Sequence, residues 1–270
     1  MESLGYAGVI RSLRSLRGEP TDVVAPAATG VRYRAAATRG IEPLADLYLP
    51  VNPSGASAVL VHGGGFVIGS RAMKPMRLLA ARLSRARIAV CAIDYRMIFR
   101  GGRLAEALDD VAAAHEFWGE RVAGYGLDPA RISMIGLSAG GTLAMLAAAR
   151  AAEGTLHRLV SCFGLYEIDH LHGPASVLPR LLFGTADRDA WRMRSPGHAE
   201  QPRIPTLLLH GDDDRLVPIE QARRLAARRA ELGLPTKLVV YPAAPHGFFN
   251  IAGSPAADAA TLELIDFVSG

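Results

Sequence analysis

A serine between two glycines is the clearest candidate for chemistry in the sequence. Ser138 is the centre of residues 136–140 (Gly-Leu-Ser-Ala-Gly), which follow an apolar run and precede a segment of small residues. Glycines on both sides let a strand and a helix approach closely around a strained serine, whose hydroxyl is then exposed above the helix N-terminus. The same pattern fits a serine that only caps an ordinary helix. A catalytic role for Ser138 therefore requires partner residues.

A run of three glycines is the first partner. Residues 62–66 (His-Gly-Gly-Gly-Phe) follow the apolar run 58–61 directly. Consecutive glycines leave their backbone N–H groups unshielded, and such donors stabilise the negative charge of a tetrahedral intermediate in acyl transfer. A flexible turn is the alternative, but the place of this run after a strand and before the serine motif favours the oxyanion interpretation.

An acid and a base complete the set. Residues 205–218 contain three consecutive aspartates after an apolar run, and Asp214 is the predicted acid because Asp-x-x-Val-Pro places it where the chain turns back into a helix. His246, in Pro-His-Gly-Phe-Phe after the last apolar run, is the predicted base. A carboxylate can orient the imidazole that takes the serine proton. His210 is a competing base, but it lies before the turn and is expected to brace the loop.

The remaining candidates concern the substrate pocket. Phe66, Tyr166 and His170 are predicted to line it, together with His172. The other histidines lie in predicted helices or in the irregular segment, and they are expected to be surface or local hydrogen-bonding residues. No His/Cys spacing typical of a metal site is found, so no metal or cofactor is predicted.

Apolar runs that alternate with helical patterns predict the elements that position these residues. The predicted strands are 45–49, 58–62, 88–94, 132–137, 159–164, 206–210 and 238–241, and the predicted helices are 72–84, 104–123, 140–152, 219–232 and 256–268. This order is typical of an α/β protein whose mostly parallel sheet is covered by helices on both faces. Sites in such sheets form at the carboxyl ends of the strands. All four motifs follow predicted strands.

Two segments depart from this alternation. Residues 1–30 are expected to hold a short amphipathic helix over about 4–17, then a connector rich in proline, alanine and glycine that could contribute to a cap. Residues 31–270 form the predicted catalytic domain. Within it, 165–203 have no clear period, and a segment of that length inside a compact domain is typical of a lid or a pocket element.

Composition bounds the class of protein. Half of the 270 residues are hydrophobic, 21% are charged and the net charge is +4, so a large core is expected and disorder is not. The arginines are scattered, which argues against nucleic-acid binding. The two cysteines lie in apolar runs and are expected to be packed thiols. Without a secretion signal or a membrane-spanning run, we expect a cytoplasmic protein that can form a homodimer.

Taken together, the motifs resemble those of the hormone-sensitive-lipase-like esterases of the α/β-hydrolase superfamily. The matching landmarks extend over residues 40–250 and include 62–70 (His-Gly-Gly-Gly-Phe-Val-Ile-Gly-Ser), 94–96 (Asp-Tyr-Arg) and 136–141 (Gly-Leu-Ser-Ala-Gly-Gly). The chain order Ser138, Asp214, His246 is that of α/β-hydrolases. The resemblance implies an α/β-hydrolase fold with a small cap. It also implies oxyanion donors at the amides of Gly64, Gly65 and Ala139, with Gly63 and His62 in supporting roles, His62 by holding the loop in place.

The resemblance also implies hydrolysis of carboxylic esters, usually with short acyl chains, and without a cofactor. The sequence departs from the family at Leu137, where many relatives have an acidic residue, and at 97–102. Residues 182–196 are similar to the compact acetyl-esterase and arylformamidase types. An amide, formamide, lactone or acetylated natural product is thus the alternative substrate. A non-catalytic small-molecule binding protein is the alternative of another class.

Overall fold

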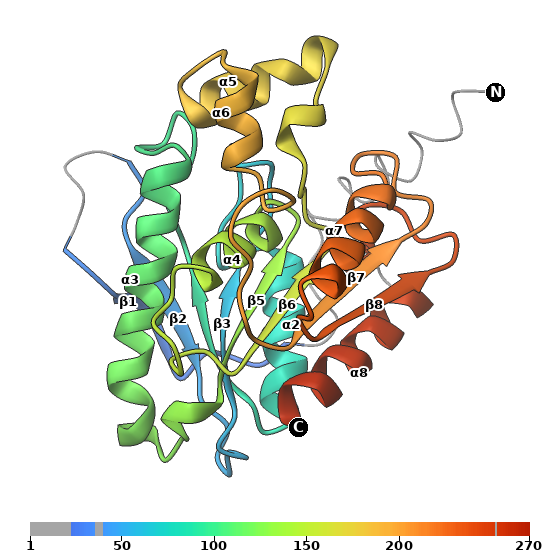
Figure 1. The fold of residues 1–270 in the computed structure, drawn as a ribbon. Coiled ribbons are helices and arrows are strands. Elements are labelled where there is room, and N and C mark those ends of the chain that lie inside the picture. The colour runs from blue at the N-terminus through green and yellow to red at the C-terminus, as the bar shows by residue number, and fades with distance from the viewer. Residues whose placement is uncertain (1–22, 36–39, 252) are drawn as a thin grey trace.

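The structure is a computed structural model that describes residues 23–35, 40–251 and 253–270. The helix predicted over 4–17 lies outside these residues. An eight-stranded sheet forms the centre of the molecule (Figure 1), in the spatial order β1-β2-β4-β3-β5-β6-β7-β8. The strands are β1 (Ala28–Arg32), β2 (Leu44–Tyr48), β3 (Ser57–Val61), β4 (Ala89–Ile93), β5 (Ile132–Leu137), β6 (Arg158–Cys162), β7 (Thr206–Gly211) and β8 (Thr236–Tyr241).

The sheet is mostly parallel, as predicted. Strands β4, β3, β5, β6, β7 and β8 pair in parallel, whereas β1 pairs with β2 and β2 with β4 in antiparallel fashion. Every residue of β3, β4, β5 and β7 is buried. Strands covered on both faces need apolar side chains on both sides, which explains their continuous apolar runs.

Helices cover both faces of the sheet (Figure 1). The long helices are α2 (Lys74–Arg85), α3 (Leu104–Val122), α4 (Ala139–Ala148), α7 (Glu220–Glu231) and α8 (Pro255–Ser269), and short 3₁₀ turns lie at η2 (Ala123–Tyr125), η3 (Pro129–Arg131) and η6 (Phe248–Asn250). The buried side chains of α3, α4 and α7 belong to one hydrophobic cluster, and those of α2 and α8 belong to another. The sheet therefore has one core on each face, as the α/β pattern predicts.

Strand β1 was not predicted, and it lies in the connector rich in small residues. Its backbone pairs with β2, and Asp46 ties it to that strand by accepting hydrogen bonds from Thr29 Oγ1 (2.8 Å) and from the Gly30 N–H (2.9 Å). Only Ala28 and Val31 of its five residues are apolar, so it has no continuous apolar run of the kind that marks the central strands. An edge strand held by its backbone and one carboxylate gives little signal in its own residues.

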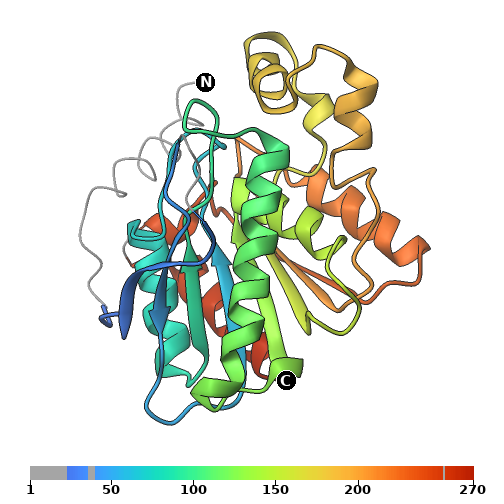
Figure 2. The same cartoon turned by 90° about the vertical axis from the view of Figure 1, so that its left-hand side faces the viewer.

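The segment 165–203, in which the sequence shows no clear period, has four short helical elements. It contains η4 (Ile168–His170), η5 (Gly173–Ser176), α5 (Val177–Phe183) and α6 (Arg188–Met193), which stand beyond the carboxyl ends of the strands in Figure 1 and again in the turned view of Figure 2. Trp191 anchors it, because its ring is buried and its Nε1–H donates to the Thr185 carbonyl at 2.9 Å. Helices of six or seven residues are too short to show a clear period. The role of this segment as a lid stays a prediction.

No helix among the described residues has the length and apolar character needed to cross a membrane. The thiols of Cys91 and Cys162 are free and buried in the sheet, as expected.

Candidate active site

Ser138 lies on the sharp turn between β5 and α4. Its φ of 52° and ψ of −119° are unusual for a residue with a side chain, and such strain is common at functional sites. The turn requires glycine at position 136, since a Cβ there would lie 2.1 Å from the Gly140 carbonyl oxygen. The Ser138 N–H donates to the Cys162 carbonyl of the neighbouring strand at 2.8 Å. Backbone strain and this hydrogen bond hold the serine above the N-terminus of α4.

Three side chains that are distant in sequence form a hydrogen-bonded chain at this turn. Ser138 Oγ lies 2.9 Å from His246 Nε2, and His246 Nδ1 lies 2.7 Å from Asp214 Oδ2. The carboxylate can only accept, so Nδ1 carries the proton and Nε2 is left to accept the serine proton. The three residues predicted from the sequence are thus brought together in the arrangement that acyl transfer requires.

Asp214 is the only one of the three consecutive aspartates that contacts His246 among the described residues. Its Oδ1 accepts the N–H groups of Leu216 (3.0 Å) and Val217 (2.8 Å), which belong to the turn that brings the chain back. Asp212 accepts the Ala243 N–H instead. Asp213 pairs with Arg215 at the surface. Burial alone would raise the pKa of Asp214, but the hydrogen bonds from His210, His246 and Val217 lower it to about 2.

His246 lies in the loop after β8. The edge of its ring faces Phe163, with the ring centroids 5.1 Å apart, and its side chain is 11% exposed. Phe163 follows β6 directly and has a φ of 41°. An aromatic wall on one side and Asp214 on the other restrict the imidazole to a single orientation. The base is therefore oriented toward Ser138.

The glycine run lies against the serine. A Cβ on Gly63 would lie 2.8 Å from the Leu137 carbonyl oxygen and 3.2 Å from Ser138 Cβ. Gly64 and Gly65 then turn the chain with φ values of 119° and 62°, and the Ile68 N–H closes the turn on the Gly64 carbonyl at 3.1 Å. Ala139 is the first residue of α4, so its N–H needs no partner within the helix. These amides are the candidate oxyanion donors.

His62 and Tyr95 hold the start of this loop. The ring of His62 stacks on that of Tyr95, with centroids 4.2 Å apart, and its Nδ1 lies 2.7 Å from the Gly63 carbonyl oxygen. The Tyr95 hydroxyl donates to the His62 carbonyl at 2.9 Å. Burial lowers the pKa of His62 to about 4, so the ring is neutral near pH 7. A neutral ring that donates through Nδ1 suits a bracing role.

Arg71 anchors the far end of the loop, and sequence reasoning missed it. Its guanidinium pairs with Asp46 on β2 (Nε–Oδ1 2.8 Å) and with Asp94 after β4, and its own N–H donates to Asp94 Oδ1 at 2.7 Å. Burial would raise the pKa of Asp46, but the hydrogen bonds from Arg71, Gly30 and Thr29 lower it. Asp94 belongs to a motif visible in the sequence, whereas nothing in the sequence pairs it with Arg71.

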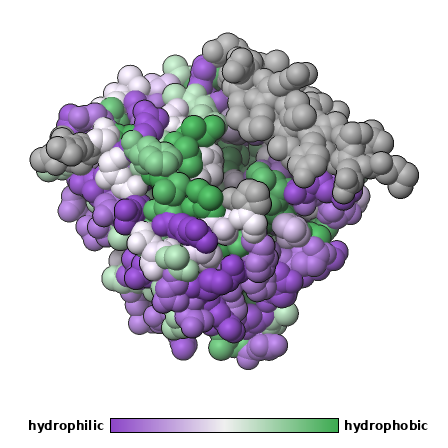
Figure 3. Space-filling view, turned by 90° about the horizontal axis from the view of Figure 1, so that it is seen from above, coloured by the Kyte–Doolittle hydropathy of each residue, from purple (hydrophilic) through white to green (hydrophobic). Residues whose placement is uncertain are grey.

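A cavity of about 320 Å³ opens beside Ser138 and His246. Most of its lining is apolar and comes from the glycine loop, the start of α2 and the loop after His246; its side chains include Ile68, Met73, Pro75, Met76, Leu137, Phe163, Leu216 and Asn250. Ile68 and Leu216 remain 55% and 57% exposed. Seen from above, hydrophobic side chains gather on this face of the molecule (Figure 3). The reactive serine therefore faces an apolar environment.

The residues predicted for the substrate pocket do not line this cavity. Phe66 is buried in the core. Tyr166 is also fully buried, and its hydroxyl lies 2.8 Å from Ser161 Oγ. His170 lies in η4, where its Nδ1 is 3.0 Å from Glu167 Oε2. The prediction fails because a sequence does not show toward which side of a loop an aromatic or imidazole ring turns.

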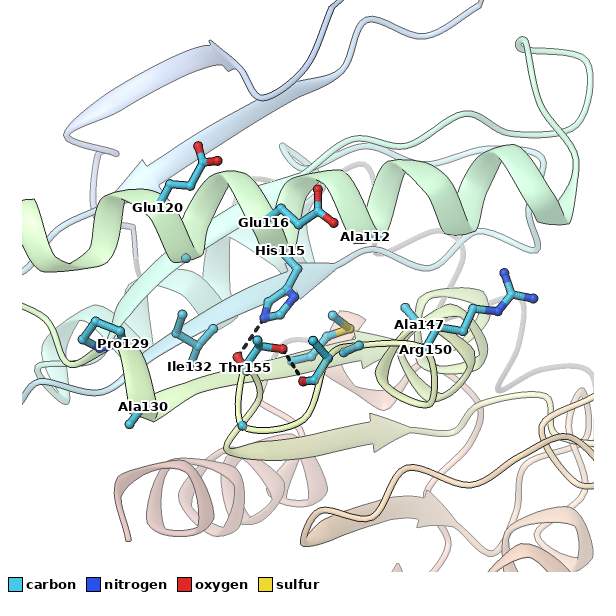
Figure 4. Close-up of a pocket in the computed structure, with 15 residues that line it drawn as sticks. Ala112, His115, Glu116, Glu120, Pro129, Ala130, Ile132, Ala147, Arg150 and Thr155 are labelled. Carbon is cyan, nitrogen blue, oxygen red and sulfur yellow. Dashed lines mark hydrogen bonds between the residues drawn. The ribbon is translucent and has the colours of Figure 1, made fainter.

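A second cavity, of about 680 Å³, lies between α3 and the connection from α4 to β6 (Figure 4). His115 forms part of its wall and bonds the Thr155 carbonyl through Nε2 at 2.9 Å, while Glu116 and Glu120 lie on the same helix. Although this cavity is larger, its described lining offers no serine or cysteine next to a base. Among the described residues, no cluster of histidine, cysteine or acidic side chains fits a metal ion.

The chain is similar to known esterases in sequence and in fold. A family model described as BD-FAE matches residues 45–228. A probable isoprenylcysteine alpha-carbonyl methylesterase of Arabidopsis thaliana is 30% identical over 74% of this chain and 48% of its own length. The esterase LipC of Mycobacterium tuberculosis is 29% identical over 80% of this chain and 59% of its own length. The chain thus spans about half of the length of the curated relatives it matches.

Solved structures show the same fold. A thermophilic esterase from the planctomycete Thermogutta terrifontis aligns with a TM-score of 0.71 and 27% identity, over 90% of this chain and 91% of its own. Esterase B from Lactobacillus rhamnosis, inhibited by a tributyrin phosphonate, aligns with a TM-score of 0.77 and 20% identity, over 99% of this chain and 94% of its own. The resemblance inferred from the motifs is confirmed.

Proposed function

Since the chain belongs to the BD-FAE family and has the α/β-hydrolase fold of known esterases, we propose that it is a serine hydrolase of carboxylic esters. The hydrogen-bonded chain Ser138–His246–Asp214, whose serine and histidine line an apolar cavity, carries this proposal. Relatives whose names describe esterases support it.

The geometry supports a two-step reaction. His246 Nε2 takes the proton of Ser138 as Oγ attacks the ester carbonyl, and Asp214 stabilises the imidazolium that forms. The amides of Gly64, Gly65 and Ala139 donate to the oxyanion. Collapse of the tetrahedral intermediate transfers the proton from His246 to the leaving alcohol and leaves an acyl-serine. Water then attacks the acyl-serine with His246 again as base, which releases the acid and restores the enzyme.

The cavity favours a compact, uncharged substrate. A volume of about 320 Å³ is at the lower end of the range for small-molecule pockets. Fully buried Met76 and the half-buried Met73 lie at the start of α2, where they limit the length of an apolar group. We therefore propose short acyl esters as substrates. Cavity size is the basis for this choice, and it also fits the small esters to which the sequence resemblance points.

Hydrolysis of p-nitrophenyl acetate, butyrate and palmitate tests the proposal. We expect the acetate and butyrate to be hydrolysed fastest and Ser138→Ala to lose almost all of this activity. Ser161→Ala is a control, because Ser161 is a buried serine that bonds Tyr166 outside the cavity. Wild-type rates in Ser138→Ala would contradict the proposed nucleophile, and a preference for palmitate would contradict the proposed substrate class. Parallel assays with amides and lactones separate the alternative substrates.

We also propose that a small-molecule ester is the only partner the site requires, and that the enzyme acts in the cytoplasm, where the thiols of Cys91 and Cys162 stay reduced. Cell fractionation tests the location. Light scattering tests the homodimer expected from the sequence.

A further inference from the structure

His210 is a buried histidine that the mechanism above does not use. It lies in β7, four residues before Asp214, and its side chain has no solvent exposure. Its Nε2 lies 3.1 Å from Asp214 Oδ2 and 2.9 Å from the Val217 carbonyl oxygen. The same Oδ2 atom faces Nδ1 of His246. Asp214 therefore lies between two imidazoles, one of which faces the serine.

The partners of His210 determine its tautomer. The Val217 carbonyl can only accept a hydrogen bond, and so can the ionised Asp214 carboxylate. Two acceptors on one nitrogen require that Nε2 carries the proton. The other ring nitrogen, Nδ1, is buried and has no hydrogen-bond partner among the described residues. His210 is consequently a donor toward Asp214.

We propose that His210 is a positioning residue that fixes the Asp214 carboxylate, and through it the orientation of His246. This proposal rests on the proposed hydrolase function. Asp214 Oδ1 is held by the backbone N–H groups of Leu216 and Val217, and Oδ2 receives Nε2–H of His210 as well as Nδ1–H of His246. Donors on both oxygens prevent the carboxylate from rotating about its Cβ–Cγ bond.

The second donor also changes the charge balance of the site. The titratable side chains that face Asp214 are His210 from β7 and His246 from the loop after β8, whereas neighbouring Asp213 and Arg215 pair with each other at the surface. Without His210, one lone pair of a buried carboxylate lacks a donor, so Asp214 holds a proton more strongly and stabilises protonated His246 more strongly. Both effects move the acidic limb of the kcat/KM profile to higher pH.

Two substitutions at position 210 test this role. His210→Gln keeps an N–H near the place of Nε2, and His210→Leu has no donor. With p-nitrophenyl acetate, and with active sites counted by fluorophosphonate titration, we expect His210→Leu to lose about ten-fold or more in kcat, with KM nearly unchanged because His210 does not line the cavity. The acidic limb of the kcat/KM profile of His210→Leu should move up by about half a pH unit or more. For His210→Gln, both kcat and the position of this limb should stay near those of the wild type.

A buried histidine elsewhere is the matched control. His115 also bonds a backbone carbonyl through Nε2, but it lies on α3 beside the other cavity. His115→Gln should leave the pH profile unchanged. Wild-type kcat and an unshifted limb in His210→Leu would overturn the proposal. Equal losses of kcat in His210→Leu and His210→Gln, with no shift of the acidic limb in either, would also overturn it, because that result indicates a purely structural role.

A measurement on the unmodified protein covers the case in which His210→Leu does not fold. Histidine ¹⁵N NMR should show Nε2 of His210 protonated and Nδ1 unprotonated in the resting enzyme; the opposite tautomer would overturn the proposal. The NMR result is independent of ester turnover. A protein that keeps this tautomer but hydrolyses no ester would refute the proposed function and leave the hydrogen bond between His210 and Asp214 in place.

Discussion

Gly64 gives the sharpest test of the glycine loop, because its neighbour Gly65 is a matched control. A Cβ at position 64 would lie 1.8 Å from the Ile68 carbonyl oxygen, and the backbone there has a φ of 119°. At position 65 a Cβ would meet no atom within 4 Å, although φ is 62°. Gly64→Ala must therefore open the turn, whereas Gly65→Ala adds only the cost of a left-handed residue, about 1–2 kcal/mol.

When the turn opens, the backbone N–H groups of Gly64 and Gly65 no longer point at the oxyanion of the tetrahedral intermediate. Loss of one such donor lowers kcat about 10²- to 10³-fold, which corresponds to ~3–4 kcal/mol of transition-state stabilisation. We expect Gly64→Ala to show at least this loss in kcat for p-nitrophenyl acetate. KM should change little, and Gly65→Ala should stay within a few-fold of the wild type. Thermal unfolding should confirm that both variants are folded. A folded Gly64→Ala variant with the kcat of the wild type would refute the assignment of the oxyanion donors to this loop.

Three further substitutions test other parts of the site. Met76→Ala should cost about 2–5 kcal/mol in unfolding free energy and should raise the kcat/KM ratio of p-nitrophenyl octanoate to butyrate, because a fully buried side chain leaves the cavity wall. Because folding lowers the pKa of Asp214 from 3.8 to about 2, ionised Asp214 adds about 2 kcal/mol of stability above pH ~4, which is lost as the pH falls toward 2. Urea unfolding at decreasing pH should therefore show a steeper loss in the wild type than in Asp214→Asn; parallel curves would contradict the lowered pKa. Arg71→Ala leaves the carboxylates of Asp46 and Asp94 without their cation and should cost about 3–5 kcal/mol, against less than about 1 kcal/mol for Arg223→Ala, whose exposed ion pair with Glu220 is the control.

The central strands could be predicted because the sheet is covered on both faces. Continuous apolar runs mark β3, β4, β5 and β7, and the motifs at their ends then converge by topology alone. Strand β1 left no such signal, since its pairing depends on backbone groups and on Asp46 of the neighbouring strand.

Within the site, the residues that could be predicted are those whose backbone conformation requires a particular residue type. The turn at Ser138 requires glycine at position 136, and that requirement is visible in the sequence. The pairing of Arg71 with Asp94 depends on side chains that meet only in the folded protein, and so does the burial of Tyr166. Local spacing also pointed to Asp214 among the three aspartates. The backbone N–H groups of Leu216 and Val217, which bond its carboxylate, lie only two and three residues further along the chain.

Covalent labelling of Ser138 tests the central claim most directly. A fluorophosphonate reacts with a serine only where a base activates the hydroxyl and donors stabilise the adduct. Peptide mass spectrometry of the labelled wild type should find the adduct on Ser138, and Ser138→Ala should remain unlabelled. An unlabelled wild type, or an adduct on another serine that persists in Ser138→Ala, would contradict the account.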